Sequence, residues 1–344
     1  MSISGVIKKL NSKTDLNKED LLVIVHDFTE KKVNDEDIKS LVIAWREKGE
    51  TSLELKELVD ILFSRQKQLD TYKDTIDLCG TGGDKLNTFN ISTLSAIVAS
   101  SCGAKVIKHS GRSTTSISGS VDILGKFGLN IDISNEVKER CFKQTSLMFI
   151  GSKILRDIFG SVKEICKNID MPGFVNLLGP LTNPYKTSYH LLGVSKTEWG
   201  NLLAAALKLQ DSKKEALIVC SKISENLCMD ELSFCGRNYV WRLTRGEIKK
   251  EIIEVEDLGH KLINPEELVI CNIDEGKTVF ESVLKGNLAN QDSRADVVAL
   301  NVGAALYLAN KVKSIASGYE FALRQIHSGK AWEHFQGFMN CNKE

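Results

Sequence analysis

The chain has 344 residues, of which 42% are hydrophobic, and its 45 basic side chains are balanced by 45 acidic ones. This length and apolar content predict a substantial core in two domains, or in one large domain with a small appendage. Because the net charge is zero, we expect no nucleic-acid partner. The start MSISGVIKKL lacks a long apolar segment and no apolar run would span a bilayer, so we expect a cytoplasmic protein with no membrane partner.

Residues 1–72 are expected to form a small helical domain. Apolar residues recur every three or four positions in 17–32, 34–50 and 52–68. Asn34 is a candidate N-cap and Gly49 a candidate C-cap of the second helix. A unit of this size is too small for a large core of its own, so it is expected to pack on the rest of the chain or on a second subunit.

From residue 75 onward, short β-rich runs alternate with helical stretches, which predicts an α/β domain over 73–344. The expected strands are 75–79, 104–110, 146–150, 190–194 and 215–220. A hairpin is expected within 239–255 and a long helix over 293–312.

Nine cysteines are present and none forms a C-x-x-C pair. Apolar or small residues surround Cys79, Cys102, Cys220 and Cys271. We expect these to be buried, reduced thiols of a cytoplasmic protein, in preference to disulfides or metal ligands.

The stretch 77-DLCGTGGDKLNTFNIST-93 places Gly80, Gly82 and Gly83 directly after a predicted strand. Backbone amides bared by glycine beside a helix N-terminus form an anion site, for which phosphate or pyrophosphate is the natural ligand. The alternative is a tight turn without a ligand. Lys85 stands where a dinucleotide-binding G-x-G-x-x-G would need its last glycine, and a Walker A motif is absent.

Three further segments carry groups suited to a phosphorylated ligand. Lys108, Arg112 and several hydroxyls lie in 108-KHSGRSTTSISGSVD-122, which suits a sugar phosphate, although an ordinary polar loop is the alternative. The carboxylates in 229-MDELS-233 are hard ligands for magnesium, and the alternative is an acidic surface turn. The proline-rich segment 172-PGFVNLLGPLTNP-184 predicts a crossover or hinge between the two regions.

Together these segments resemble the anthranilate phosphoribosyltransferase family. The matching runs are 80-GTGGD-84, 90-NIST-93, 108-KHSGR-112, 118-SGSVD-122, 176-NLLGPLTNP-184 and 230-DELS-233. The resemblance implies a small N-terminal helical domain hinged to a larger α/β domain with a central mixed sheet, and a crossover near 165–190 packing on the helical part. It also implies a homodimer through the helical domain, phosphoribosyl pyrophosphate (PRPP) as donor, Mg2+ as cofactor and a small aromatic acceptor.

The resemblance assigns PRPP-binding roles to the residues at matching motif positions: Gly80, Gly82, Gly83, Asp84, Asn90, Ser92, Thr93, Lys108 and Ser120. It assigns the metal to Ser92, Asp230 and Glu231. It implies that an acceptor nitrogen attacks carbon 1 of the ribose in line as pyrophosphate leaves, with positioning as a main source of rate. No side chain is an evident catalytic base.

The departures from the family pattern concentrate on the acceptor side. The family has an asparagine, a histidine and an arginine at the positions of Gly111, Arg156 and Pro172, and a lysine at Ile117. The lost arginine pairs with the acceptor carboxylate in the family, and Arg156 is a candidate replacement because a guanidinium can grip a carboxylate from another direction. The residues expected to line the acceptor site are His109, Gly111 and Arg156.

These features predict a phosphoribosyltransferase with anthranilate as the default acceptor, acting in tryptophan biosynthesis. One alternative is the same chemistry on another aromatic or heteroaromatic acceptor. A nucleoside phosphorylase is disfavoured by the full set of donor motifs. A non-catalytic relative that binds nucleic acid or a protein partner fits the lost acceptor residues, but not the intact donor and metal residues.

Overall fold

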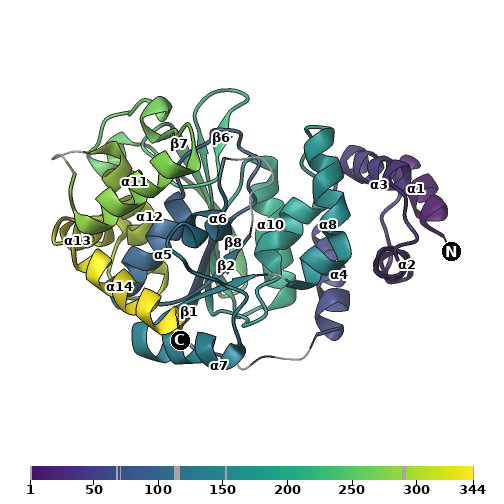
Figure 1. Ribbon diagram of the computed structural model, residues 1–344. Helices are drawn as coiled ribbons and strands as arrows, with labels where there is room; N and C mark the ends of the chain where they lie inside the picture. The colour runs from purple at the N-terminus through teal and green to yellow at the C-terminus, as the bar shows by residue number, and fades with distance from the viewer. Residues whose placement is uncertain are drawn as a thin grey trace.

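The N-terminal helices stand to one side of a larger α/β unit (Figure 1). The computed structural model describes residues 2–66, 69, 71–111, 117–151, 153–288 and 292–343. The N-terminal helices are α1 (Ile3–Asn11), α2 (Lys18–Thr29), α3 (Asp35–Lys48) and α4 (Ser52–Ser64).

The predicted helices of this region are confirmed, and their ends have identifiable causes. Asn17, Asn34 and Thr51 each accept a hydrogen bond from a backbone amide in the first turn of the following helix. Helix α3 ends where Gly49 takes a φ of +88°, a conformation that favours glycine.

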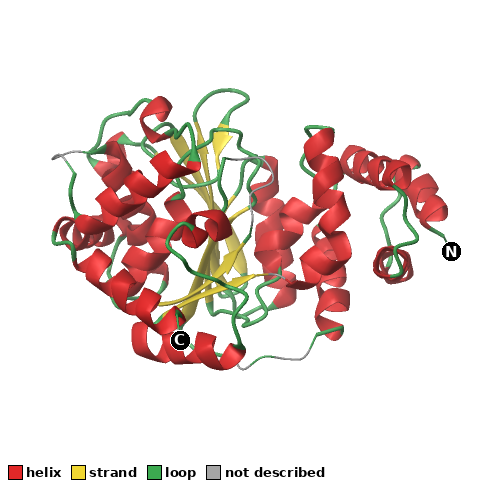
Figure 2. Ribbon diagram, in the orientation of Figure 1, coloured by secondary structure: helices red, strands yellow, loops and turns green. Residues whose placement is uncertain are grey.

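A mixed eight-stranded sheet forms the centre of the larger unit, as expected from the alternating pattern (Figure 2). The strands are β1 (Thr75–Gly80), β2 (Lys105–Ser110), β3 (Leu147–Gly151), β4 (Tyr189–Gly193), β5 (Glu215–Lys222), β6 (Cys228–Met229), β7 (Arg237–Thr244) and β8 (Glu247–Ile253). Their order is β3-β2-β1-β4-β5-β7-β8, with β6 beside β5. The first five strands run parallel, so their carboxyl ends meet at one edge of the sheet.

The antiparallel strands β6, β7 and β8 follow β5 in the chain. Strands β7 and β8 form the predicted hairpin, and its turn residues Arg245 and Gly246 both have positive φ. Strand β6 pairs with the end of β5 and leads directly into Asp230.

Helices cover both faces of the sheet (Figures 1 and 2). The remaining α-helices are α5 (Ile91–Ser101), α6 (Ser120–Gly125), α7 (Asn135–Thr145), α8 (Lys153–Asn168), α9 (Phe174–Leu178), α10 (Glu198–Gln210), α11 (Ile273–Lys285), α12 (Ser293–Leu308), α13 (Ile315–His327) and α14 (Lys330–Asn342). Helices α5 and α12 belong to one apolar core, whereas α8, α9 and α10 share the other with α1–α4.

Helix α8 stands between the sheet unit and the outermost N-terminal helices (Figure 1). It begins at Lys153, earlier than the crossover expected near 165–190, and its buried face includes Ile158, Phe159 and Val162. Because these side chains share a core with α1–α4, the first helices do not form a separate core. The division at residues 72 and 73 stays a prediction.

The cysteines expected to be buried differ in their exposure. Cys79 and Cys220 are buried and Cys102 is partly buried, but Cys271 is exposed, so its predicted burial was wrong. Cys271 lies between an isolated β-bridge at Val269 and the start of α11, outside the regular strands whose apolar pattern it resembles. Among the described residues, the helices are too short or too polar to cross a membrane.

Candidate functional site

The glycine loop closes around Asp230. Strands β1 and β4 end side by side at Gly80 and Gly193, and a Cβ on Gly193 would lie 1.5 Å from the backbone oxygen of Asp230. A Cβ on Gly80 would lie 2.2 Å from Oδ2 of the same residue. The Gly82 amide donates a hydrogen bond of 2.8 Å to this Oδ2. Because Gly80 and Gly193 have no side chains, the ends of β1 and β4 leave room for Asp230, which is distant from both glycines in the sequence.

Gly82 and Gly83 have positive φ values of +65° and +85°, which explains the glycines at these positions. Ser195 holds the loop by donating from Oγ to the Gly82 carbonyl at 2.8 Å. Asn176 donates from Nδ2 to the Thr81 carbonyl at 3.1 Å. The loop is therefore fixed by groups from both the sheet edge and the crossover segment.

Three carboxyl groups gather beside this loop, and their pKa values are all raised. Burial and the neighbouring Asp230 raise the pKa of Asp84 to about 8. Burial raises the pKa of Asp230, and burial together with the charge of Asp230 raises that of Glu231. Lys108 is a cation whose charge opposes both of these last shifts. The site thus carries more negative charge than its neighbouring groups neutralise.

Lys108 and Ser92 face this acidic group. Lys108 is buried, and its Nζ donates to the Leu78 carbonyl and to Ser92 Oγ, the latter at 3.1 Å. Ser92 also hydrogen-bonds to Glu231, which lowers the pKa of that carboxyl. The predicted metal residues Ser92, Asp230 and Glu231 therefore lie within one connected network.

The second predicted phosphate loop joins the start of α5. Asn90 accepts a hydrogen bond of 2.9 Å from Ser118 Oγ and donates to the Ser118 carbonyl at 3.1 Å. Thr93 donates to Ser120 Oγ at 2.9 Å. The structure therefore brings together the predicted donor residues of both loops, while Arg112 lies outside the described residues.

The donor set fits a hard divalent cation. Partly buried carboxylates with raised pKa values lack a balancing positive charge, and hydroxyl and carboxylate oxygens are ligands that magnesium prefers. A bound cation would favour the ionised carboxylates and relieve their repulsion.

His109 lies near the end of β2, and Gly111 directly follows that strand. His109 is buried, its backbone amide donates to Asp77 Oδ1 at 2.9 Å, and its Nε2 has no hydrogen-bond partner among the described residues. Burial lowers the pKa of the ring to about 4. Among the described residues, which exclude 112–116, a Cβ on Gly111 would meet no atom within 4 Å. The His109 ring on this side is neutral and buried.

Arg156 is ion-paired away from these groups. Its guanidinium lies 3.3 Å from Asp132, and both side chains are 53% exposed. Pro172, at the position of the family's arginine, lies 3.7 Å from a Cβ built on Gly83. The acceptor roles of His109, Gly111 and Arg156 stay predictions.

Several residues of the site escaped the sequence analysis. Asn176 and Ser195 fix the glycine loop, and Gly193 makes room for Asp230. Gly193 lies near the end of the predicted strand 190–194 and Ser195 directly follows it, so their position at a strand end could have indicated them. Lys163 on α8 was also overlooked; the charge of Arg156 influences its pKa, although the backbone between them is non-helical at Phe159.

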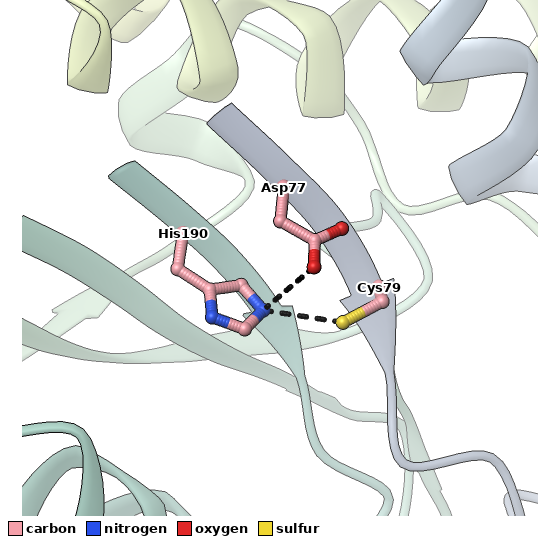
Figure 3. A group of neighbouring side chains, drawn as sticks. All are labelled: Asp77, Cys79 and His190. Atoms are coloured by element: carbon pink, nitrogen blue, oxygen red, sulfur yellow. Dashed lines mark hydrogen bonds and ion pairs between the residues drawn. The ribbon is translucent and has the colours of Figure 1, made fainter. Parts of the chain in front are cut away.

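A buried polar cluster lies deeper in the sheet, where Asp77, Cys79 and His190 point toward one another from β1 and β4 (Figure 3). Cys79 Sγ lies 3.1 Å from His190 Nε2, and Asp77 Oδ2 lies 4.0 Å from the same nitrogen. Asp77 also accepts hydrogen bonds from the His109 amide and from Asn183 Nδ2. We interpret this cluster as an internal anchor for the strand ends and the crossover segment.

The donor geometry agrees with comparisons to known proteins. Residues 72–332 match the model of the glycosyl transferase family, a/b domain. The chain is 30% identical to anthranilate phosphoribosyltransferase of Chloroherpeton thalassium, covering 96% of this chain and 95% of that protein. It is 33% identical to the enzyme of that name from Staphylococcus haemolyticus, covering 96% of each.

Solved structures agree as well. Anthranilate phosphoribosyltransferase from Thermus thermophilus superposes with a TM-score of 0.84 at 26% identity, covering 98% of this chain and 99% of that one. The Saccharomyces cerevisiae enzyme in complex with PRPP and Mg gives 0.85 at 25% identity, covering 99% and 98%. The chain therefore belongs to the anthranilate phosphoribosyltransferase family.

Proposed function

We propose that this protein transfers the 5-phosphoribosyl group of PRPP to the amino nitrogen of anthranilate, releases pyrophosphate and serves tryptophan biosynthesis. The main support for this proposal is the group of carboxyl side chains beside the glycine loop, Asp84, Asp230 and Glu231. The Gly82 amide donates a hydrogen bond to Asp230. The charge of Asp230 helps to raise the pKa values of Asp84 and Glu231, so the three carboxyl groups lie close together. This arrangement places cation-binding carboxylates directly beside the glycine loop, where a metal-bound pyrophosphate would meet both.

Each part of the network has a task in the transfer. The amides of the glycine loop bind pyrophosphate oxygens, and Lys108 adds a positive charge. Asp84 accepts hydrogen bonds from the ribose hydroxyls. Hydroxyls of Thr93 and Ser120, which lie 2.9 Å apart, position the phosphates. Because the acceptor amine is already a nucleophile, holding it in line with carbon 1 of the ribose is the main requirement.

Ser92, Asp230 and Glu231 would hold magnesium. When bound, the cation supplies positive charge to the pyrophosphate as that group departs. Burial raises the pKa values of Asp230 and Glu231, and a bound cation would favour their ionised forms.

The assembly and cellular location are also part of the proposal. Leu22 and Leu53 are 42% and 58% exposed on α2 and α4, and a homodimer through the helical region would cover them. All nine cysteines are free thiols, which supports the cytoplasm as the protein's location. Sedimentation of the wild type beside a Leu22→Lys/Leu53→Lys variant tests the dimer, which the variant should weaken.

A second candidate is the same transfer to another aromatic or heteroaromatic acceptor. It is favoured by the departures at Gly111 and Pro172, and by the ion pair that ties Arg156 to Asp132.

The deciding experiment follows the loss of anthranilate fluorescence with PRPP and magnesium present. An Asp230→Asn/Glu231→Gln variant is the control. Consumption that the variant abolishes supports the proposal. No consumption despite calorimetric PRPP binding would favour the second candidate, and no PRPP binding would overturn phosphoribosyl transfer altogether.

A further inference from the structure

Lys163 is a cation without a counterion. It lies on α8 and is partly buried, and burial together with the charge of Arg156 lowers its pKa. Within the described part of the chain, its ammonium group has neither an ion-pair nor a hydrogen-bond partner. Arg156, on the same helix, is neutralised by Asp132 at 3.3 Å. A partly buried ammonium normally has a partner, so Lys163 has an unmet demand for an anion.

His109 provides a second unmet group in the same neighbourhood. It is only 9% exposed, and its Nε2 is a buried polar atom for which the described part of the chain offers no hydrogen-bond partner. A hydrogen bond with the Gly179 backbone engages the ring, so Nε2 is the free nitrogen. The charge of Lys163 is among the causes that keep the ring neutral. A neutral ring that donates to a carbonyl through one nitrogen accepts through the other.

The two groups complement one small molecule. An aromatic ring with a carboxylate next to an amine carries an anion and an N–H donor on adjacent carbons. Such a molecule satisfies a lone ammonium and a lone imidazole acceptor at the same time, whereas an amine without a carboxylate leaves the ammonium unpaired.

We propose that Lys163 binds the carboxylate of the acceptor while His109 Nε2 accepts a hydrogen bond from its amine. The inference rests on the proposed function and deepens it, because it assigns carboxylate recognition to α8 in a chain with Pro172 at the family's arginine position. Lys163 thereby selects for an ortho-aminobenzoate over a neutral amine.

The test compares Lys163→Met, Lys163→Arg and the matched control Lys167→Met. Lys167 lies one turn further along α8 and is exposed. Calorimetry with magnesium and pyrophosphate present gives the Kd for anthranilate, and steady-state rates give KM and kcat. We expect Lys163→Met to weaken binding and raise KM about 10- to 100-fold, since a charged hydrogen bond is lost. Lys163→Arg should restore part of the affinity, and Lys167→Met should match the wild type.

Two readouts separate recognition from a structural role. Aniline lacks the carboxylate, so Lys163→Met should not reduce its use relative to the wild type. PRPP affinity should also be unchanged and Tm should not fall, because an unpaired, partly buried cation does not stabilise the fold. An unchanged anthranilate Kd in Lys163→Met would overturn the inference while leaving the proposed function intact. If the wild type fails to turn over anthranilate, the proposed function falls, and the calorimetric comparison still decides the role of Lys163.

Discussion

The two sides of the site carry opposite charge imbalances. Around the glycine loop, burial raises the pKa values of Asp84, Asp230 and Glu231, and the charge of Asp230 adds to the rise at the other two. On the side of His109, whose ring feels the charge of Lys163, the described residues give Lys163 no anion and His109 Nε2 no donor. The acidic side therefore needs the positive charge of the metal that accompanies pyrophosphate. The other side needs the negative charge of a carboxylate and the N–H donor of an amine.

The largest effect should come from removing charge on the acidic side. Glu231→Gln deletes a hard oxygen ligand, and we expect kcat/KM to fall about 100-fold or more, since charge on the leaving group loses its stabilisation. Glu225→Gln is the matched control, because Glu225 is exposed in the turn just before β6. Initial rates at several magnesium concentrations check this. Equal activity of both variants would remove Glu231 from the metal site.

The acidic side also depends on the bare strand end at Gly193. In Gly193→Ala the new Cβ would meet the Asp230 carbonyl at 1.5 Å, so the segment must shift. We expect a loss of about 1–3 kcal/mol in unfolding free energy and a lower magnesium affinity. Urea unfolding and magnesium titration measure these. Gly337→Ala, where a Cβ meets nothing within 4 Å in α14, should be neutral or stabilising.

The acidic side should also respond to pH in a defined direction. The pKa of Asp84 is raised from 3.8 to about 8, so the folded state holds a proton that the unfolded state releases. Its contribution is present at low pH and is lost as pH rises toward 8. His109 and His190 have pKa values lowered to about 4 and about 3, so their stabilising contribution is complete above about pH 6.5.

Between pH 6.5 and 8 the two histidines therefore do not change the unfolding free energy. Without divalent cations, we expect the wild type to lose about 1 kcal/mol of unfolding free energy across this window. Asp84→Asn should flatten the slope, and exposed Asp157→Asn should keep it. Chemical denaturation at several pH values measures this. A slope that Asp84→Asn leaves unchanged would mean that other groups titrate there.

The sequence predicted what depends on local pattern. Helical spacing, alternation and the glycine loop indicated α3, the parallel strands and the residues from Gly80 to Asp84, because each depends on neighbours within a few positions. The packing of Asp230 against Gly193 depends on contact between segments distant in the sequence, which no local pattern encodes. Cys271 looked buried because its neighbours are apolar, yet no regular strand forms there.

The acceptor side was the harder half for the same reason. The sequence indicated Arg156 as the replacement cation because it occupies a diverged position, but a sequence does not reveal that Asp132 neutralises it. Lys163 differs from other lysines only through its surroundings, namely partial burial, the missing partner and the nearby His109.

The smallest expected effect tests that distinction between the two cations. Arg156→Gln breaks an ion pair whose members are each 53% exposed, and such pairs contribute about 0.2–1 kcal/mol. We expect Tm and the KM for anthranilate to change little, in contrast to Lys163→Met. Asp132→Asn frees Arg156 without removing it, so it should also leave KM nearly unchanged. A tenfold rise in KM for Arg156→Gln, with a fall for Asp132→Asn, would mean that Arg156 leaves Asp132 to bind the acceptor, and carboxylate recognition would then belong to the start of α8.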